Sequence, residues 1–188
     1  MKHFKSILAF LFIILLFSCG ESSSNSTLDV SGFKEIEKSL DNKFGANAYY
    51  TGVTVTHNKA IGNIIGVTVT EVPESLKMGQ WNQTQGNWTQ NAEITLEIPE
   101  GTTASDYMFQ LGEDFSLEEL GALVEESIQK LKDEKNIENP SLSIASINFP
   151  DNGDTSKAEY MVNLTPQNGG TTFSFYYTIS GDFIKMDY

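Results

Sequence analysis

Apolar and polar positions recur with two different periods along the chain, and the changes of period predict two helices, each followed by strands. The first helical pattern begins after Ser31, a suitable N-cap, and ends before Gly45, a residue that commonly terminates helices. Its apolar residues are three or four positions apart, as one face of an α-helix requires: Phe33, Ile36, Leu40 and Phe44.

A second helical pattern begins at a capping box, in which Ser116 and Glu119 are expected to satisfy backbone N–H groups at the helix start. The pattern continues to about Lys132, and Pro140 prevents a longer helix. Its apolar stripe consists of Leu117, Leu120, Val124, Ile128 and Leu131.

The other segments alternate apolar and polar residues with the two-residue period of half-buried β-strands. The alternation predicts strands at 49–56, 65–70, 88–98, 142–149, 158–164, 173–179 and 183–188. In the strand at 142–149 the apolar phase slips between Ile144 and Ile147, which indicates a β-bulge. The predicted fold class is α+β: an antiparallel sheet of about six or seven strands with two helices on one face.

The order of predicted elements repeats, as a helix and three strands followed by a helix and three or four strands. The two helix starts are also alike, Asp29-Val30-Ser31 and Asp114-Phe115-Ser116. A degenerate duplication of an αβββ unit is one interpretation. Chance recurrence of common helix-start residues is the other, and both lead to the same fold class.

The N-terminal segment has the three parts of a secretory signal peptide. Lys2 and Lys5 precede an apolar run over residues 7–17, and a small residue, Ser18, stands directly before Cys19. The run is shorter than the roughly 20 residues that a membrane-spanning helix needs.

The stretch Leu16-Phe17-Ser18-Cys19 resembles the lipobox of bacterial membrane lipoproteins, although Phe17 is larger than is usual at its position. The resemblance implies cleavage after Ser18 and acylation of Cys19, so that lipid chains anchor the protein in a membrane. Gly20 after the cysteine implies the outer membrane of the bacterial cell envelope. We therefore expect a signal peptide at 1–18, a lipidated and flexible tether at 19–28, and a single domain at 29–188.

Composition narrows the possible partners. The chain of 188 residues has a formal net charge of −13, and all 12 of its basic residues are lysines. Nucleic-acid binding depends on basic side chains that displace counterions, so we expect no nucleic-acid partner. Cys19 is the only cysteine, so the domain is expected to have no disulfide and no thiolate chemistry.

Residue types that carry catalysis or metal binding are scarce, and we expect neither an enzyme nor a cofactor or metal. His57 is the only histidine after the signal peptide, and no common catalytic motif accompanies it. Residues 151–154 (Asp-Asn-Gly-Asp) contain calcium-ligand residue types but lack the EF-hand spacing, so we interpret them as a turn. The acidic residues of the second helix fall off its apolar stripe, which is typical of a solvated face.

One polar stretch, residues 77–88, contains both tryptophans among Gln, Asn, Thr and Gly. Trp88 is in phase with the apolar face of its predicted strand, whereas Trp81 is predicted to lie in a loop. An aromatic ring among amides suits a glycan, because the ring stacks on a sugar and the amides bond its hydroxyls. The ligand-binding residues of this hypothesis are Trp81, Asn82, Gln83, Gln85 and Asn87.

The sequence thus predicts a lipid-anchored envelope protein whose specific role is not encoded in a recognisable motif. The leading hypothesis is a non-catalytic module that binds another envelope protein. The alternative is a glycan- or small-ligand-binding module that uses the segment around Trp81.

Overall fold

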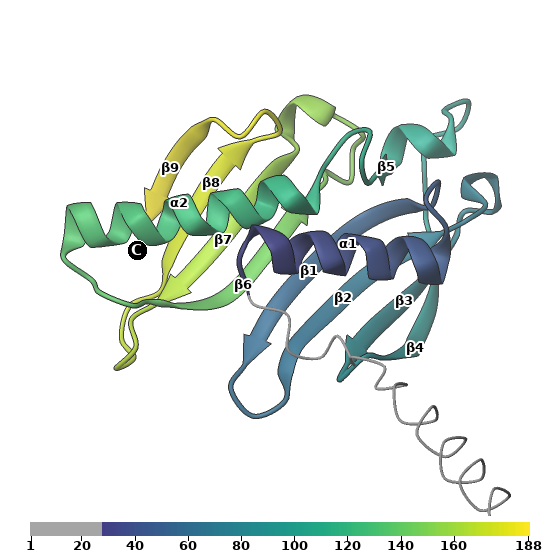
Figure 1. Ribbon diagram of the computed structural model, residues 1–188. Coiled ribbons are helices and arrows are strands. Elements are labelled where there is room, and N and C mark those ends of the chain that lie inside the picture. The colour runs from purple at the N-terminus through teal and green to yellow at the C-terminus, as the bar shows by residue number, and fades with distance from the viewer. Residues whose placement is uncertain (1–27) are drawn as a thin grey trace, which may run out of the picture.

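The computed structural model describes residues 28–188, and the predicted signal peptide, Cys19 and most of the predicted tether lie outside the described residues. Within residues 28–188, nine strands form a single antiparallel sheet and two helices pack on it, which confirms the α+β fold class (Figure 1). The helices are α1 (Val30–Phe44) and α2 (Leu117–Lys135). The strands are β1 (Tyr49–Asn58), β2 (Gly62–Thr70), β3 (Lys77–Thr84), β4 (Asn87–Thr95), β5 (Phe109–Gln110), β6 (Ser141–Asn148), β7 (Glu159–Thr165), β8 (Phe173–Thr178) and β9 (Phe183–Asp187).

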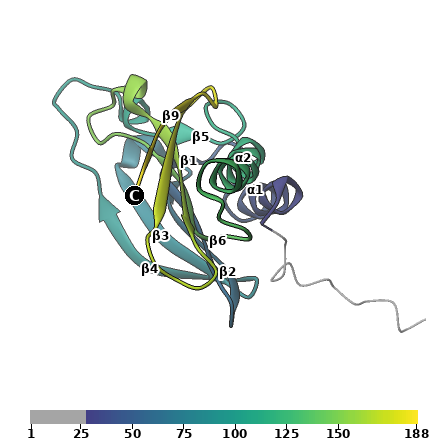
Figure 2. The same ribbon diagram turned by 90° about the vertical axis from the view of Figure 1, so that its left-hand side faces the viewer.

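The strand order is β4-β3-β2-β1-β6-β7-β8-β9, and the short β5 pairs with the start of β1. Each half is a helix followed by four consecutive strands, and the halves join where β1 pairs with β6. Three short 3₁₀ turns occur in the connections: η2 (Pro73–Ser75), η3 (Ala104–Tyr107) and η4 (Thr155–Lys157). Figure 2 shows both helices on the same side of the sheet.

The expected count of six or seven strands is wrong, because the structure has nine. The sequence pattern missed β3, whose Gln, Asn and Gly residues are uncommon in strands. Pairing with β2 on one side and β4 on the other overrides that preference. The pattern also missed β5, which is only two residues long.

The main core lies between the sheet and the two helices. Helix α1 contributes Phe33, Ile36, Leu40 and Phe44, as its periodicity predicts, and Gly45 ends the helix with a φ of 89°. The N-cap is Asp29 rather than Ser31, because the Asp29 carboxylate accepts the N–H of Gly32 at 2.9 Å. A second, smaller cluster lies on the other side of the sheet: Met78, Ala104 and Met108, with Ile94, Leu96 and Ile98 packed against them.

The predicted cap of α2 is confirmed in part. The Ser116 hydroxyl accepts the N–H of Glu119 at 3.3 Å, but the N–H of Ser116 donates to the Tyr160 hydroxyl and not to a glutamate side chain. A bulge is present in β6, but the pairing with β7 shifts between Leu142 and Ile144 and not between Ile144 and Ile147, where the sequence pattern predicted it.

Each helix supplies a hydrogen-bond acceptor to the N-terminus of the other. The Glu37 carboxylate of α1 accepts the N–H of Leu117 at 2.6 Å, and the Glu125 carboxylate of α2 accepts the N–H of Val30 at 3.2 Å. The helices run antiparallel and approach closely at Gly121, where a Cβ would lie 2.9 Å from the Cα of Val30. The first N–H groups of a helix have no partner within the helix, so these contacts tie the two halves together.

Candidate functional site

The predicted glycan-binding residues do not lie in a loop. Trp81, Asn82 and Gln83 belong to β3, Asn87 begins β4, and Gln85 and Gly86 form the tight turn between the strands. Gln85 has a φ of 50° and Gly86 a φ of 77°, the left-handed conformations of a two-residue hairpin turn. The loop prediction for Trp81 is therefore wrong.

Both tryptophans pack against the end of α1. Trp81 is paired with Val67 of β2, so its side chain is on the helix-covered face of the sheet. Its ring meets Phe44 edge to face at 5.6 Å, and the Trp88 ring meets Phe44 in the same way at 5.1 Å. The Lys43 ammonium lies over the Trp81 ring, 4.5 Å from its centroid. One face of this ring is therefore occupied, which leaves less of it for stacking on a sugar.

The amide side chains of the same hypothesis separate to different places. Gln83 is buried and donates to the Ser39 hydroxyl of α1 at 3.0 Å, so it fixes the hairpin to the helix. Asn87 donates to the backbone carbonyl of Gln85 within the turn. Asn82 and Asn87 lie on the opposite face of the sheet, where both are exposed. The five residues are divided between the helix-covered face, the opposite face and the turn.

The face of the sheet opposite the helices, here called the open face, is nearly uncharged. Strand register defines its members, because directly paired residues share a face. The first row of paired residues is Thr89, Asn82, Gly66, Thr54, Ser146, Met161, Tyr176 and Lys185. The rows on either side are Ala92, Gln80, Thr68, Gly52, Asn148, Glu159 and Thr178, and Asn87, Thr84, Ile64, Thr56, Ile144, Asn163, Ser174 and Asp187. The charged members are Glu159, Lys185 and Asp187, all from β7 and β9.

The open face is hollowed over β1, β2 and β3, where Gly52 and Gly66 carry no side chain. The hollow has a volume of about 290 Å³ and is lined also by Thr54, Gln80 and Asn82. A Cβ on Gly66 would lie 2.7 Å from the Thr54 hydroxyl oxygen, so glycine is needed for this close approach. Uncharged hydroxyl and amide groups of this kind can donate and accept hydrogen bonds without a charged ligand.

A second hollow of about 350 Å³ adjoins the first, and both are lined by Thr68 and Gln80. Its walls include Leu96, Ile98 and Tyr107 from the segment that covers this end of the open face, and Glu97 and Asp151 also line it. The two hollows together combine a polar floor with an apolar wall, which is the composition of many ligand sites.

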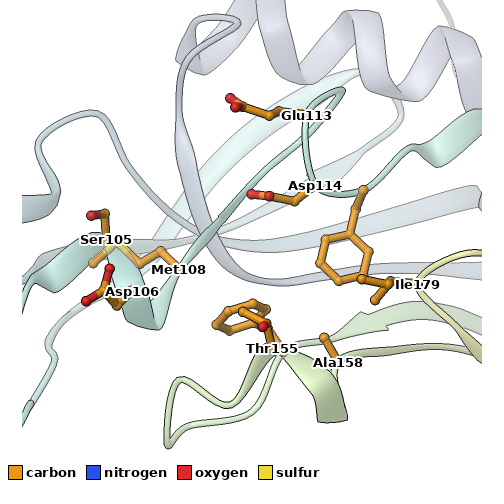
Figure 3. A pocket seen from close by; sticks show the side chains of 10 residues that line it. Ser105, Asp106, Met108, Glu113, Asp114, Thr155, Ala158 and Ile179 are labelled. Atoms are coloured by element: carbon orange, nitrogen blue, oxygen red, sulfur yellow. The ribbon is translucent and has the colours of Figure 1, made fainter.

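A separate cavity of about 410 Å³ lies beyond the end of the central strands, between η3, the loop before α2, and η4 (Figure 3). Asp106, Glu113 and Asp114 line it together with apolar side chains such as Phe115 and Ile179. None of these carboxylates takes part in an ion pair within residues 28–188. The lining contains no histidine or lysine, so the rim of the cavity is acidic.

The residues weighed for catalysis and metal binding have structural partners. His57 is exposed at the end of β1, and its Nδ1 lies 2.9 Å from the Asn63 side-chain oxygen. In the 151–154 turn, Asp154 accepts from the Ser156 backbone N–H and caps η4. Across residues 28–188, no three His, Cys, Asp or Glu side chains are grouped so that they could hold a metal ion.

Glu37, Tyr50 and Tyr177 are among the buried or half-buried groups whose pKa values are raised. Burial raises the pKa of Glu37 above its usual range, while the hydrogen bond from Leu117 opposes this shift. Burial also raises the pKa of Tyr177 to about 12, and its hydroxyl lies 2.7 Å from the Ser127 hydroxyl. Burial raises the pKa of Tyr50 further, and the Tyr50 hydroxyl has no hydrogen-bond partner. All three groups lie between helix and sheet, and none lines the cavity or the hollows.

None of the helices within residues 28–188 is long and apolar enough to cross a lipid bilayer. Comparisons of the chain with known protein families, with curated proteins and with solved structures found no match.

Proposed function

We propose that this protein is a lipid-anchored, non-catalytic module of the bacterial cell envelope that binds a partner protein through the open face of its sheet. The observation that carries the proposal is the distribution of charge. The chain has 25 acidic residues, yet the open face has no charged side chain from β4 to β6. Protein interfaces are depleted of charge at their centres, and the open face from β4 to β6 shares this depletion.

Anchoring is the second part of the proposal and rests on the sequence. The lipobox-like Leu16–Cys19 stretch would place acyl chains on Cys19, and the domain begins about ten residues later. A tether of that length, rich in serine, lets the open face turn toward a partner in the same membrane. Cys19→Ser should move the protein from the membrane to the soluble fraction and abolish labelling by palmitate. Unchanged fractionation would contradict the anchor.

The docking surface can be tested with one pair of matched variants. Thr68→Arg places a long cation in the middle of the open face, whereas Asn42→Arg makes the same chemical change on the exposed side of α1. Acylated protein with either substitution would be used to capture partners from its own envelope, with identification by mass spectrometry. We expect a partner that wild type and Asn42→Arg retain and Thr68→Arg loses. Retention by all three would contradict docking on the open face.

A second candidate function is binding of a neutral glycan, and the hollow around Gly52 and Gly66 is the observation that favours it. Its uncharged hydroxyl and amide lining would bond sugar hydroxyls, and the adjoining Tyr107 ring offers an apolar wall. Binding of neutral oligosaccharides by the wild-type protein, lost in Thr68→Arg without any protein partner, would favour this function. This hollow shares Trp81 and Asn82 with the site predicted from the sequence, but Gln83, Gln85 and Asn87 do not line it.

We also infer that the two halves arose by duplication of a helix-plus-four-strand unit. The unit has one strand more than the expected αβββ repeat, because β3 and β4 both belong to the first half. The reciprocal contacts of Glu37 and Glu125 support the inference. Each carboxylate lies in the second or third turn of its own helix and accepts the first N–H of the other helix.

A further inference from the structure

Exposed apolar side chains gather at one edge of the sheet. Within residues 28–188, the large apolar side chains with high exposure are Ile61, Val72, Ile179, Phe183, Ile184 and Tyr188. The last four belong to β9, the turn before it and the residue after it, with exposed fractions of 47%, 43%, 49% and 73%. Isolated exposed apolar residues are ordinary, but a group of them marks an interaction site.

The two edges of the sheet differ in chemistry. Strand β4 forms one edge and exposes mainly Thr, Gln, Asn and Glu. Strand β9 forms the other edge, and it carries exposed apolar side chains beside the charged Lys185 and Asp187. Both edge strands pair irregularly with their neighbours, β4 between Gln80 and Trp81 of β3 and β9 between Tyr176 and Tyr177 of β8, so bulges do not distinguish the edges. The β9 edge is the more apolar of the two.

We propose that β9 is a dimerisation edge, which pairs antiparallel with β9 of a second copy of this chain and joins the two sheets. A two-fold axis perpendicular to the sheet keeps each side chain on its own face. Directly opposed residues must then lie on the same face of the joined sheet. The two-fold axis must therefore pass through a residue that pairs with itself, and each alternative register places a different residue at the axis.

Charge selects one of these registers. Lys185 and Asp187 lie on the same face, because they oppose Tyr176 and Ser174 of β8. With Met186 at the axis, Lys185 of each copy lies opposite Asp187 of the other. An axis at Lys185 would oppose two lysines, and an axis at Asp187 would oppose two aspartates. Opposite charges directly across an antiparallel pair stabilise it, and like charges destabilise it.

The second copy fits this edge better than an unrelated strand does, because the strand is complementary to itself. Within one copy, Lys185 and Asp187 already form an ion pair at 2.6 Å, and both side chains remain 54% exposed. In the dimer each charge gains a second partner without leaving the first. The formal net charge of −13 on each copy opposes association, so we expect the dimer to become stronger as moderate salt screens this repulsion.

Charge exchange tests the register in the full chain, purified in detergent and studied by sedimentation equilibrium. K185D and D187K should each weaken the dimer about tenfold, since each places like charges opposite one another at two symmetric positions. The double variant K185D/D187K restores both opposed pairs and should return the dissociation constant to within about threefold of wild type. Thermal melts of the same variants check that the fold is retained. A wild-type chain that stays monomeric, or single variants that dimerise as well as wild type, would overturn the proposal.

Cross-linking tests the position of the axis independently. Met186→Cys should give a cross-linked dimer on mild oxidation, because position 186 faces itself in the proposed register. Ala92→Cys, at the exposed β4 edge, is the matched control, and wild type reports any background from Cys19. Cross-linking of Met186→Cys no greater than that of Ala92→Cys would overturn the proposed edge.

Discussion

The two halves of the molecule have the same order of elements but cover their outer strands differently. Helix α2 has 19 residues and is about 29 Å long, whereas α1 has 15 residues and is about 22 Å long. In the second half, Phe175 and Tyr177 of β8 are fully buried in the main core. In the first half, the β3–β4 hairpin is held by two half-buried tryptophans at the end of α1. In the first half, large aromatic side chains take the place of the missing helix length. The outer strands of the first half are therefore covered less completely than those of the second half.

The largest expected effect is a loss of stability that differs between the cores of the two halves. Phe175→Ala should lower the free energy of unfolding by about 3–5 kcal/mol, the usual cost of deleting a buried phenylalanine ring. Phe44→Ala should cost less, about 2–3 kcal/mol, because the neighbouring tryptophans can move into the space. Urea denaturation measures both. An equal or larger loss for Phe44→Ala would contradict the difference between the halves.

The next effect concerns the two tryptophans. The sequence pattern predicts Trp88 on the apolar face of a strand and Trp81 in a loop. Both contact Phe44 and both are half-buried, so Trp81→Ala and Trp88→Ala should each cost about 1–2 kcal/mol, less than a fully buried ring. Hydrogen exchange should show the loss mainly in β3 and β4. A neutral Trp81→Ala beside a strongly destabilising Trp88→Ala would instead favour the original hypothesis of a free Trp81.

Removal of a single tyrosine hydroxyl should lower the free energy of unfolding in the second half, and leave it unchanged or raise it slightly in the first half. Tyr177→Phe removes a hydrogen bond to Ser127 and should cost about 1 kcal/mol. Tyr50→Phe removes a buried hydroxyl without a partner and should be neutral or slightly stabilising. Thermal melts of the two variants provide the comparison. A clear loss of stability in Tyr50→Phe would show that its hydroxyl has a partner in solution.

The smallest expected effect is a pH dependence from the contact between the halves. Because the pKa of Glu37 is raised on folding, the folded protein holds its proton more tightly than the unfolded chain. The associated stability is present below the unfolded pKa and is lost as pH rises through the folded pKa. Glu37→Gln keeps an acceptor for Leu117 and should reduce this decline above about pH 4.5 in urea denaturation. If the free energy of unfolding of Glu37→Gln declines with pH as steeply as that of wild type, other groups cause the pH dependence.

Local patterns predicted much of the fold. The periodicity of α1 identified its buried face, Gly45 ended it, and the alternation of β1 and β2 separated core valines from threonines of the open face. The prediction failed for β3, because its polar composition resembles a loop when its strand partners are unknown. The N-cap was misassigned to Ser31 because Asp29 and Ser31 are both good caps and lie two residues apart.

The candidate surfaces were harder to predict. The open face depends on which strands are neighbours, and the pairing of β1 with β6 cannot be read from periodicity. The contact of Gln83 with Ser39 and that of Glu37 with Leu117 join residues distant in sequence, so neither leaves a local signal. The cluster of exposed apolar residues around β9 was accessible in principle, since Phe183, Ile184 and Tyr188 all lie within the strand that the pattern predicted at 183–188.

The pairing of β1 with β6 has a consequence for the time course of folding. It joins residues about 90 positions apart, such as Val55 and Ala145, and central contacts of such long sequence separation are formed slowly. The β1–β4 segment is synthesised first, so the edge of β1 that β6 will occupy has no partner until the second half is complete. While it has no partner, this edge of β1 is free to pair with β1 of another chain, and we expect aggregation to begin there if synthesis stops before β6.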